Sequence, residues 1–425
     1  MKIYLDTIGC RLNQSEIESF SLQFRAAGHE LVADMKEADL MVLNTCTVTA
    51  SAASDSRQKV RQANRAGVKK IAVTGCLASL KPEDLAKLDS VSHIIPNSKK
   101  DSLVSEVLNI DQSTINLNNI SREPIPGSRF RTRAFIKVQD GCDNQCTYCV
   151  TTIARGPGKS QQIETILKDI EFALNGGAKE IVLTGVHLGS WGYDINPQQH
   201  LKDLICLILQ NKDIPRLRIS SLEPWDIDDT FFDLWEDPRL CRHLHLPLQS
   251  GSASVLKRMA RKITPEEFAK LIHTARKKIP GIAITTDVMV GFPGETEEEF
   301  EESFRFIEQL NFSGGHVFTY SEREGTPAVK LHDSVHNFTR KERSKTLRNS
   351  LKLSEDRYKE EFIGKSLSVL WENALPSSGG QYILSGLTDN YLKVKAESYI
   401  SLVNQISQVK IESITKSALR AIIIQ

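Results

Sequence analysis

Three cysteines stand close together at Cys142, Cys146 and Cys149, separated by three and then two residues. They follow a predicted strand over residues 134–138 and occupy a short loop rich in Gly, Asp and Asn, which can wrap three corners of one iron–sulfur cluster. The absent fourth ligand would leave one iron open to a small molecule, as catalytic metal sites keep one position free. Tetrahedral zinc, with a histidine as the fourth ligand, is the alternative interpretation.

Three further cysteines share a position relative to the predicted strands. Cys10, Cys46 and Cys76 each stand just after a strand, and the carboxyl ends of parallel strands meet at one edge of a sheet. A single such cysteine would be a small buried hydrophobe, but three at the same position predict a second metal cluster. We expect Cys206 and Cys241 to pack in cores, since Cys206 lies on an apolar helix face and no neighbouring thiol accompanies Cys241.

The elements that must position these cysteines fall into three parts. Residues 1–108 alternate strand and helix patterns, which predicts a parallel-sheet α/β domain with right-handed crossovers, and residues 109–128 form a linker rich in Asn, Ser, Pro and Gly. Six strand patterns alternate with helices in residues 129–360, which favours a full or partial (β/α) barrel over a doubly wound sheet. Short strands between turns predict a small β-barrel in residues 361–425. The fold class is therefore α/β with a small C-terminal β-barrel.

Composition excludes several classes of protein. The chain has 425 residues, a net charge of +1 and 40% apolar residues, which excludes wholesale disorder and a small disulfide scaffold. Asp6 interrupts any signal peptide and no stretch is apolar enough to span a membrane, so we expect a cytoplasmic protein. Nucleic-acid binding would need local charge, and residues 121–160 and 340–360 each carry a net charge of +4.

The Cys142–Cys149 spacing, together with a barrel, resembles the radical S-adenosylmethionine (SAM) enzymes. That resemblance implies a 4Fe–4S cluster whose open iron binds SAM. The two cysteine sets together resemble the methylthiotransferase family, and the tail resembles the RNA-binding TRAM module. The similar stretches are residues 9–14, 44–49, 74–76, 141–149, 183–185, 245–252 and 287–296, with 362–365 and 386–391 in the tail.

Residues 9–14 and 44–49 are most similar to the subgroup that acts on N6-threonylcarbamoyladenosine at position 37 of tRNA. The resemblance implies a transferase that inserts a methylthio group at C2, using two 4Fe–4S clusters and SAM. The cluster at Cys142, Cys146 and Cys149 would cleave SAM, and the cluster at Cys10, Cys46 and Cys76 would carry the sulfur. It also implies three partners, namely the tRNA anticodon loop, an unidentified electron donor and a sulfur source.

The same resemblance makes Gly185, Glu223 and Gln249 candidate SAM contacts. A tight turn at Gly185 and loop hydrogen bonds at Glu223 and Gln249 are equally good structural explanations. Residues 150–161 depart from the family pattern, because they lack its Ile-Pro pair and are less basic. Two alternatives remain, namely the same chemistry on isopentenyladenosine tRNA or a ribosomal protein, and a zinc-stabilised RNA-binding protein without catalysis.

Overall fold

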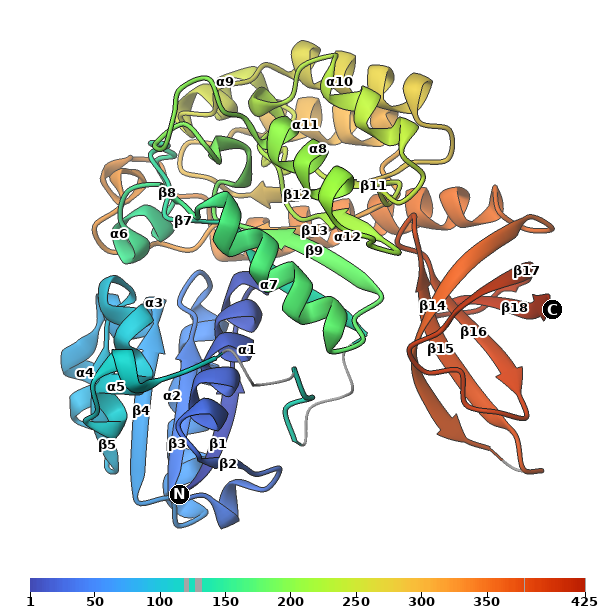
Figure 1. Cartoon of the computed structure of the whole chain (residues 1–425). Helices are drawn as coiled ribbons and strands as arrows, with labels where there is room; N and C mark the ends of the chain where they lie inside the picture. The colour runs from blue at the N-terminus through green and yellow to red at the C-terminus, as the bar shows by residue number, and fades with distance from the viewer. Residues whose placement is uncertain (118–121, 127–131, 378, 425) are drawn as a thin grey trace.

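The computed structural model describes residues 1–117, 122–126, 132–377 and 379–424, arranged in three parts (Figure 1). Residues 118–121 and 127–128 of the predicted linker lie outside the described residues, as do Arg129 and Arg131 of the first basic stretch. The bounds predicted for the three domains stay a prediction. In the described part of the chain, no helix combines the length and apolar character needed to cross a membrane.

The N-terminal part is a parallel sheet covered by helices on both faces. The strand β3 is buried along its whole length because a hydrophobic cluster lies on each side of it. In spatial order the strands are β2 (Glu30–Leu31), β1 (Lys2–Thr7), β3 (Leu40–Thr45), β4 (Lys70–Gly75) and β5 (Val91–Ile95). The helices are α1 (Arg11–Ala26), α2 (Ala50–Arg65), α3 (Cys76–Leu80), α4 (Pro82–Ala86) and α5 (Leu103–Leu108).

The central part is an open barrel of parallel strands. Two three-stranded sheets are joined by bridges between Leu217 and Leu240 and between Ser221 and His245. The strands therefore follow one another in chain order, as in a (β/α) barrel, whereas a doubly wound sheet reverses its order. The predicted partial barrel is confirmed and the doubly wound alternative is wrong. The strands are β6 (Arg133–Lys137), β9 (Glu180–Thr184), β10 (Leu217–Ile219), β11 (His243–His245), β12 (Ala283–Val290) and β13 (Gly314–Thr319).

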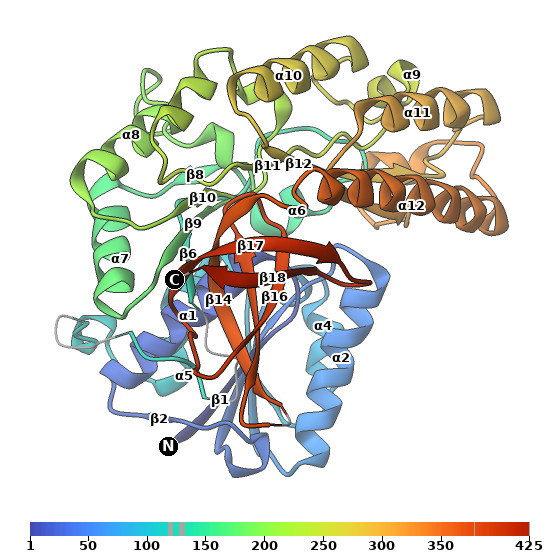
Figure 2. The ribbon, with the colours of Figure 1, turned by 90° about the vertical axis from the view of Figure 1, so that its right-hand side faces the viewer.

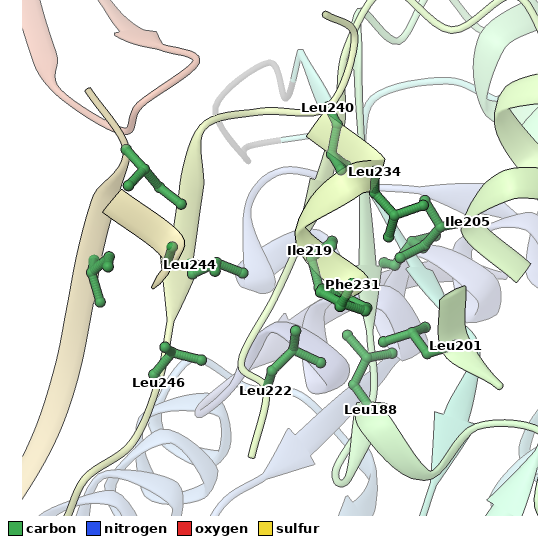
Figure 3. Close-up of a cluster of buried hydrophobic side chains, with 14 of the residues drawn as sticks. Leu188, Leu201, Ile205, Ile219, Leu222, Phe231, Leu234, Leu240, Leu244 and Leu246 are labelled. Carbon is green, nitrogen blue, oxygen red and sulfur yellow. The ribbon is translucent and has the colours of Figure 1, made fainter. Parts of the chain in front are cut away.

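Helices surround the central strands and enclose a leucine-rich core, part of which is drawn in Figure 3. Thr264 and Thr296 begin two of these helices with capping boxes, which satisfy the free backbone N–H groups there. The helices are α6 (Thr151–Arg155), α7 (Ile163–Asn175), α8 (Leu201–Asn211), α9 (Ala253–Arg258), α10 (Pro265–Lys278), α11 (Glu297–Leu310) and α12 (Asn337–Glu360). A short hairpin pairs β7 (Gln139–Asp140) with β8 (Lys159–Ser160) on either side of the Cys142–Cys149 loop.

The C-terminal part is a closed five-stranded barrel, seen side-on in Figure 1 and from the front in Figure 2. Trp371 is fully buried in its core, so this indole is not available to stack on a base. The prediction of a small β-barrel is therefore confirmed. In spatial order the strands are β14 (Ser366–Pro376), β15 (Tyr382–Thr388), β16 (Lys393–Ser398), β18 (Leu419–Ile424) and β17 (Ile406–Ile414).

The turn between β15 and β16 docks this barrel on both other parts. The Tyr391 ring stacks on His243 of β11 with centroids 4.4 Å apart, and its hydroxyl accepts a hydrogen bond of 2.9 Å from Arg11 of α1. Next to it, Asp389 pairs with Arg242 at 2.6 Å. Residues 386–391 resemble part of an RNA-binding module, but Asp389 and Tyr391 within them contact other parts of this protein.

Many charges of the two predicted basic stretches are used internally. In α12, the cations Arg340, Arg343 and Lys359 are buried, and Arg343 pairs with Glu295 and with Glu297. In the first stretch the internal pairs are Arg122–Glu18, Arg133–Glu372, Lys137–Asp140 and Arg155–Glu16. The net charge of these stretches therefore overstates what they present to a nucleic acid.

Candidate active site

Cys10, Cys46 and Cys76 lie at the carboxyl ends of three neighbouring strands, as the sequence predicted. Cys10 follows β1, Cys46 follows β3 and Cys76 follows β4, and these strands are adjacent in the sheet. Burial, together with the nearby Cys76 and Cys10 thiols, raises the pKa of the Cys46 thiol to about 11. The structure therefore brings this first triad together at one sheet edge.

Close packing of two loops holds Cys10 against Cys46. A Cβ atom on Gly9, whose φ is +117°, would lie only 2.7 Å from the Cβ of Cys46. The Asn13 amide donates to the carbonyl of Thr45 at 3.1 Å and thereby ties α1 to the end of β3. The first triad is thus preformed around a position that only glycine fits.

Cys142, Cys146 and Cys149 occupy the loop after β7, with each residue partly exposed. The backbone N–H of Asn144 lies 3.4 Å from the Cys142 Sγ atom. A methyl group on Gly141, where φ is +70°, would collide with the carbonyl oxygen of Pro157. The segment after α6 therefore packs tightly against the residue before Cys142. We call Cys142, Cys146 and Cys149 the second triad.

A histidine beside Cys142 escaped the sequence analysis. The His187 Nε2 atom lies 2.7 Å from Asp226 Oδ2. Burial opposes protonation, but hydrogen bonds to Asp226 and Cys142 outweigh it and raise the pKa of His187 to about 10. Cys142 therefore lies beside a cation at neutral pH. No spacing rule linked residue 187 to the cysteine loop, so only the fold reveals it.

The three predicted SAM contacts all lie at the carboxyl ends of central strands. Gly185 follows β9, and a Cβ atom there would lie 3.0 Å from Gln139 Oε1. Glu223 Oε2 pairs with Arg261 Nη2 at 2.7 Å. Gln249 has a φ of +73°, and its backbone N–H donates to the carbonyl of Asp287 at 2.8 Å. Their assignment as SAM contacts stays a prediction.

Arg261 connects Glu223 to the second triad. Its Nη1 atom lies 4.0 Å from the Cys146 Sγ atom, and its guanidinium lies over the Trp225 ring at 4.4 Å. The Trp225 Nε1 and Arg261 Nε atoms are buried without a hydrogen-bond partner among the described residues. Orphaned donors beside Cys146 fit a site that receives a polar ligand.

Both triads offer thiols alone, and thiolates are the usual ligands of iron–sulfur clusters. Across residues 1–117, 122–126, 132–377 and 379–424, no three His, Cys, Asp or Glu side chains gather around one point where a single metal ion could sit. The assignment of the six cysteines as cluster ligands stays a prediction. Cys206 packs against the central core and Cys241 is buried, as expected.

Arg155 lies between the two triads, in the segment that departs from the family pattern. Its guanidinium donates to Asn13 Oδ1 at 2.7 Å, to Glu16 Oε1 at 3.0 Å and to Asp140 Oδ1 at 2.8 Å. Lys100 meets the same Glu16 carboxylate at 2.7 Å. The chain contains many arginines, so the residue type alone could not identify Arg155 as a residue that links the two triads.

Comparison with known proteins places both triads in matched segments. Residues 136–307 match the radical SAM superfamily, and residues 2–96 match the uncharacterized protein family UPF0004. The threonylcarbamoyladenosine tRNA methylthiotransferase MtaB of Bacillus subtilis (strain 168) is 37% identical over 421 residues, 95% of this chain and 92% of that protein. The protein of the same name from Thermotoga maritima is 34% identical, covering 97% and 95%. The chain belongs to the radical SAM methylthiotransferase family.

Methylthiotransferases with another printed substrate are also similar. The tRNA-2-methylthio-N(6)-dimethylallyladenosine synthase of Acetivibrio thermocellus is 30% identical over 451 residues, covering 100% of this chain and 91% of that protein. The solved radical SAM methyltransferase TsrM of Kitasatospora setae shares the fold, with a TM-score of 0.56, 15% identity and coverage of 75% and 72%. The predicted family, fold and enzyme class are confirmed, and radical SAM methylthiotransferases use SAM and [4Fe–4S] clusters.

Proposed function

We propose that this methylthiotransferase replaces the C2 hydrogen of N6-threonylcarbamoyladenosine at position 37 of tRNA with a methylthio group, in the cytoplasm. The near full-length similarity to two threonylcarbamoyladenosine tRNA methylthiotransferases carries this proposal. The same reaction on dimethylallyladenosine is the second candidate, because a synthase with that substrate is 30% identical. The remaining partners would be the tRNA anticodon loop, an electron donor and a sulfur source.

The hydrogen at C2 of adenine is unactivated, so cofactors must carry the difficult step. A [4Fe–4S] cluster with SAM supplies a carbon radical that can remove such a hydrogen. Cys142, Cys146 and Cys149 would hold that cluster, and Cys10, Cys46 and Cys76 would hold the second. The protein contributes the sheet edges that present both thiol sets.

Charged neighbours of the second triad support its role as a ligand set. Three thiolates are a concentrated negative charge, and nearby cations favour the deprotonated form. Arg261 beside Cys146 is one such cation, although burial outweighs it and leaves the pKa of the Cys146 thiol raised. The orphaned donors of Trp225 and Arg261 would be available to the polar groups of SAM.

Helix α2 carries an exposed basic surface outside the two predicted stretches. Arg57, Arg61 and Arg65 follow one another at four-residue spacing and so share one helix face. None of them has an ion-pair partner in the described ranges, and Arg61 and Arg65 are exposed. The helix begins four residues after Cys46. We propose that this stripe contacts tRNA phosphates near the first triad.

Mass spectrometry of tRNA nucleosides tests the substrate. A strain lacking this gene should lose 2-methylthio-N6-threonylcarbamoyladenosine, and the wild-type gene should restore it. Retention of that nucleoside, with loss of the dimethylallyl counterpart, would transfer the assignment to the second candidate. Retention of both would reject a tRNA substrate of either kind.

Single cysteine substitutions test the division between the triads. Anaerobically prepared wild-type protein should hold about eight irons with matching sulfide, as two 4Fe–4S clusters require. Cys146→Ala should abolish SAM cleavage, whereas Cys46→Ala should abolish methylthiolation and spare SAM cleavage. Cys206→Ala is the control, because Cys206 packs against the core away from both triads. Stoichiometric zinc without iron would contradict the proposal.

A further inference from the structure

We propose that helix α6 sets the spacing between the two cysteine triads, with Arg155 as its positioning residue. This inference rests on the proposed function, since it takes both triads as cluster sites. Helix α6 begins at Thr151, two residues after Cys149, and lies above α3 in Figure 1. It is five residues long and ends at Arg155, so one short rigid turn separates the second triad from its contacts with the N-terminal domain.

Arg155 connects helix α6 to the surroundings of Cys10 through Asn13. Its Nη2 atom donates to Asn13 Oδ1 at 2.7 Å, and the same oxygen lies 3.6 Å from the Cys10 Sγ atom. Asn13 is in the first turn of α1, and Cys10 is the residue that immediately precedes this helix. Movement of α6 relative to α1 would therefore disturb the surroundings of Cys10 directly.

Asn97 connects helix α6 to the surroundings of Cys76. Its Nδ2 atom donates to the carbonyl oxygen of Ala154 at 2.8 Å and lies 3.9 Å from the Cys76 Sγ atom. Cys76 itself begins α3, and α3 contacts α6. The last two residues of α6 thus meet the neighbours of two of the three cysteines in the first triad.

Buried charge makes this junction rigid. The Arg155 and Glu16 side chains are each 2% exposed and that of Lys100 is 3% exposed. Separation of the two domains here would break the buried pair between Arg155 and Glu16, although Glu16 would keep Lys100 and Arg155 would keep Asp140. The Arg155 contacts with Glu16 and Asn13 therefore favour one relative position of α1 and α6.

Removal of the guanidinium alone should leave a folded protein. In Arg155→Gln, Glu16 keeps Lys100 at 2.7 Å and Asp140 keeps Lys137 at 3.7 Å, so neither carboxylate loses all its cations. The variant loses the link between α6 and α1 while both cysteine sets stay intact. Asn97→Ala is a milder second variant, since it removes an uncharged side chain.

The matched control is Arg343→Gln. Arg343 is also buried and also pairs with two carboxylates, Glu295 and Glu297, but all three lie in the central part. Its loss should lower stability without altering the contact between α6 and α1. A difference between Arg155→Gln and Arg343→Gln therefore separates spacing from general stability.

Hydrogen–deuterium exchange on the cluster-free protein is the first measurement. Arg155→Gln should speed exchange in peptides covering both α6 and the first turn of α1, and Asn97→Ala should do so in α6 and α3. Arg343→Gln should leave these peptides unchanged. Equal exchange in wild type and Arg155→Gln would overturn the proposal without touching the proposed function.

The reconstituted enzyme supplies the second measurement. Arg155→Gln should keep about eight irons and normal SAM cleavage. It should form about a hundredfold less methylthiolated tRNA per SAM cleaved, since small misplacements of reacting groups have effects of that size. The electron paramagnetic resonance spectrum of the reduced protein should also show weaker magnetic interaction between the clusters.

Two results would overturn the inference on spacing. One is that Arg155→Gln forms as much methylthiolated tRNA per SAM cleaved as the wild-type enzyme does. The other is an equal loss in Arg343→Gln, which would make Arg155 a stability residue only. Wild-type protein that lacks eight irons, or never methylthiolates tRNA, would instead reject the proposed function itself.

Discussion

A thiol that must lose its proton needs polar neighbours, and the two triads obtain them in different ways. In the second triad, Cys142 and Cys146 face cations, His187 and Arg261. In the first triad, Cys10 and Cys76 face side-chain amides. Arg155 brings a positive charge from the other domain to the first triad, because it donates to Asn13 beside Cys10.

Substitution of Gly9 should damage the first triad selectively. In Gly9→Ala the new Cβ atom meets the Cβ of Cys46 at 2.7 Å, and the positive φ adds strain of about 1–3 kcal/mol. We expect iron content to fall from about eight to about four per chain, with SAM cleavage retained. Iron and sulfide analysis checks this result.

In the control Gly28→Ala, φ is also positive, but the Cβ atom meets open space. Full iron content in Gly9→Ala would contradict the expectation.

The Glu180–Arg218 pair should make stability depend on pH. Burial alone would raise the pKa of Glu180, but Arg218 at 2.7 Å outweighs it and lowers that pKa. The unfolded value is about 4.3, so this stabilisation is complete above that pH and is lost as the pH falls toward the lower folded value. Glu180→Gln should therefore destabilise the protein at pH 7 by about 3–5 kcal/mol and by progressively less in acid.

Calorimetric unfolding of the cluster-free protein between about pH 7 and pH 2 measures this difference, because the loss occurs below the unfolded pKa of about 4.3. The control is Glu171→Gln, because Glu171 is 60% exposed and its pair with Lys212 is largely screened by solvent. A gap between wild type and Glu180→Gln that stays constant over this range would show that the carboxylate charge is not responsible.

Elements with a clear period were predicted well, and very short ones were not. The expected strand over residues 134–138 is β6, Arg133–Lys137. Helix α6 and the β7–β8 hairpin have five and two residues per element, too few to show periodicity. These short elements hold the second triad, so the sequence predicted the ligands but not the structure that orients them.

Helix α2 should contribute to tRNA affinity through charge. Substitution of Arg57, Arg61 and Arg65 by Gln should weaken binding and reduce the salt dependence of log Kd by up to about three counterions. Titrations of tRNA at several salt concentrations measure this slope. Lys341, Lys345 and Arg348 on α12 are exposed and form the control triple. An unchanged slope in the α2 triple would exclude the stripe as a phosphate-binding surface.

At the scale of the whole molecule, three parts meet at Tyr391. In the sequence this residue ends the stretch 386–391, which resembles the RNA-binding module of the tail. In the structure it contacts His243 of the central part and Arg11 of the N-terminal part instead. Contacts between domains leave no periodic pattern, so they could not be predicted from one sequence.

Loss of the Tyr391 side chain should loosen the C-terminal barrel. Tyr391→Ala removes the stack on His243 and the hydrogen bond from Arg11, while the core around Trp371 stays intact. We expect faster proteolysis between α12 and β14, measured by limited digestion and mass spectrometry of the fragments. Tyr399→Ala is the control, because Tyr399 is 76% exposed. Identical digestion of both variants would show that the other contacts suffice.

The hydrogen bond between Arg11 and Tyr391 also bears on biosynthesis. Its partners are 380 positions apart, and Arg11 directly follows Cys10. Domains fold in order as the chain leaves the ribosome, so the N-terminal sheet forms long before the residue that completes its surroundings has been translated. In a nascent chain, Arg11 beside Cys10 therefore gains its hydrogen bond to Tyr391 only after the last module has been synthesised.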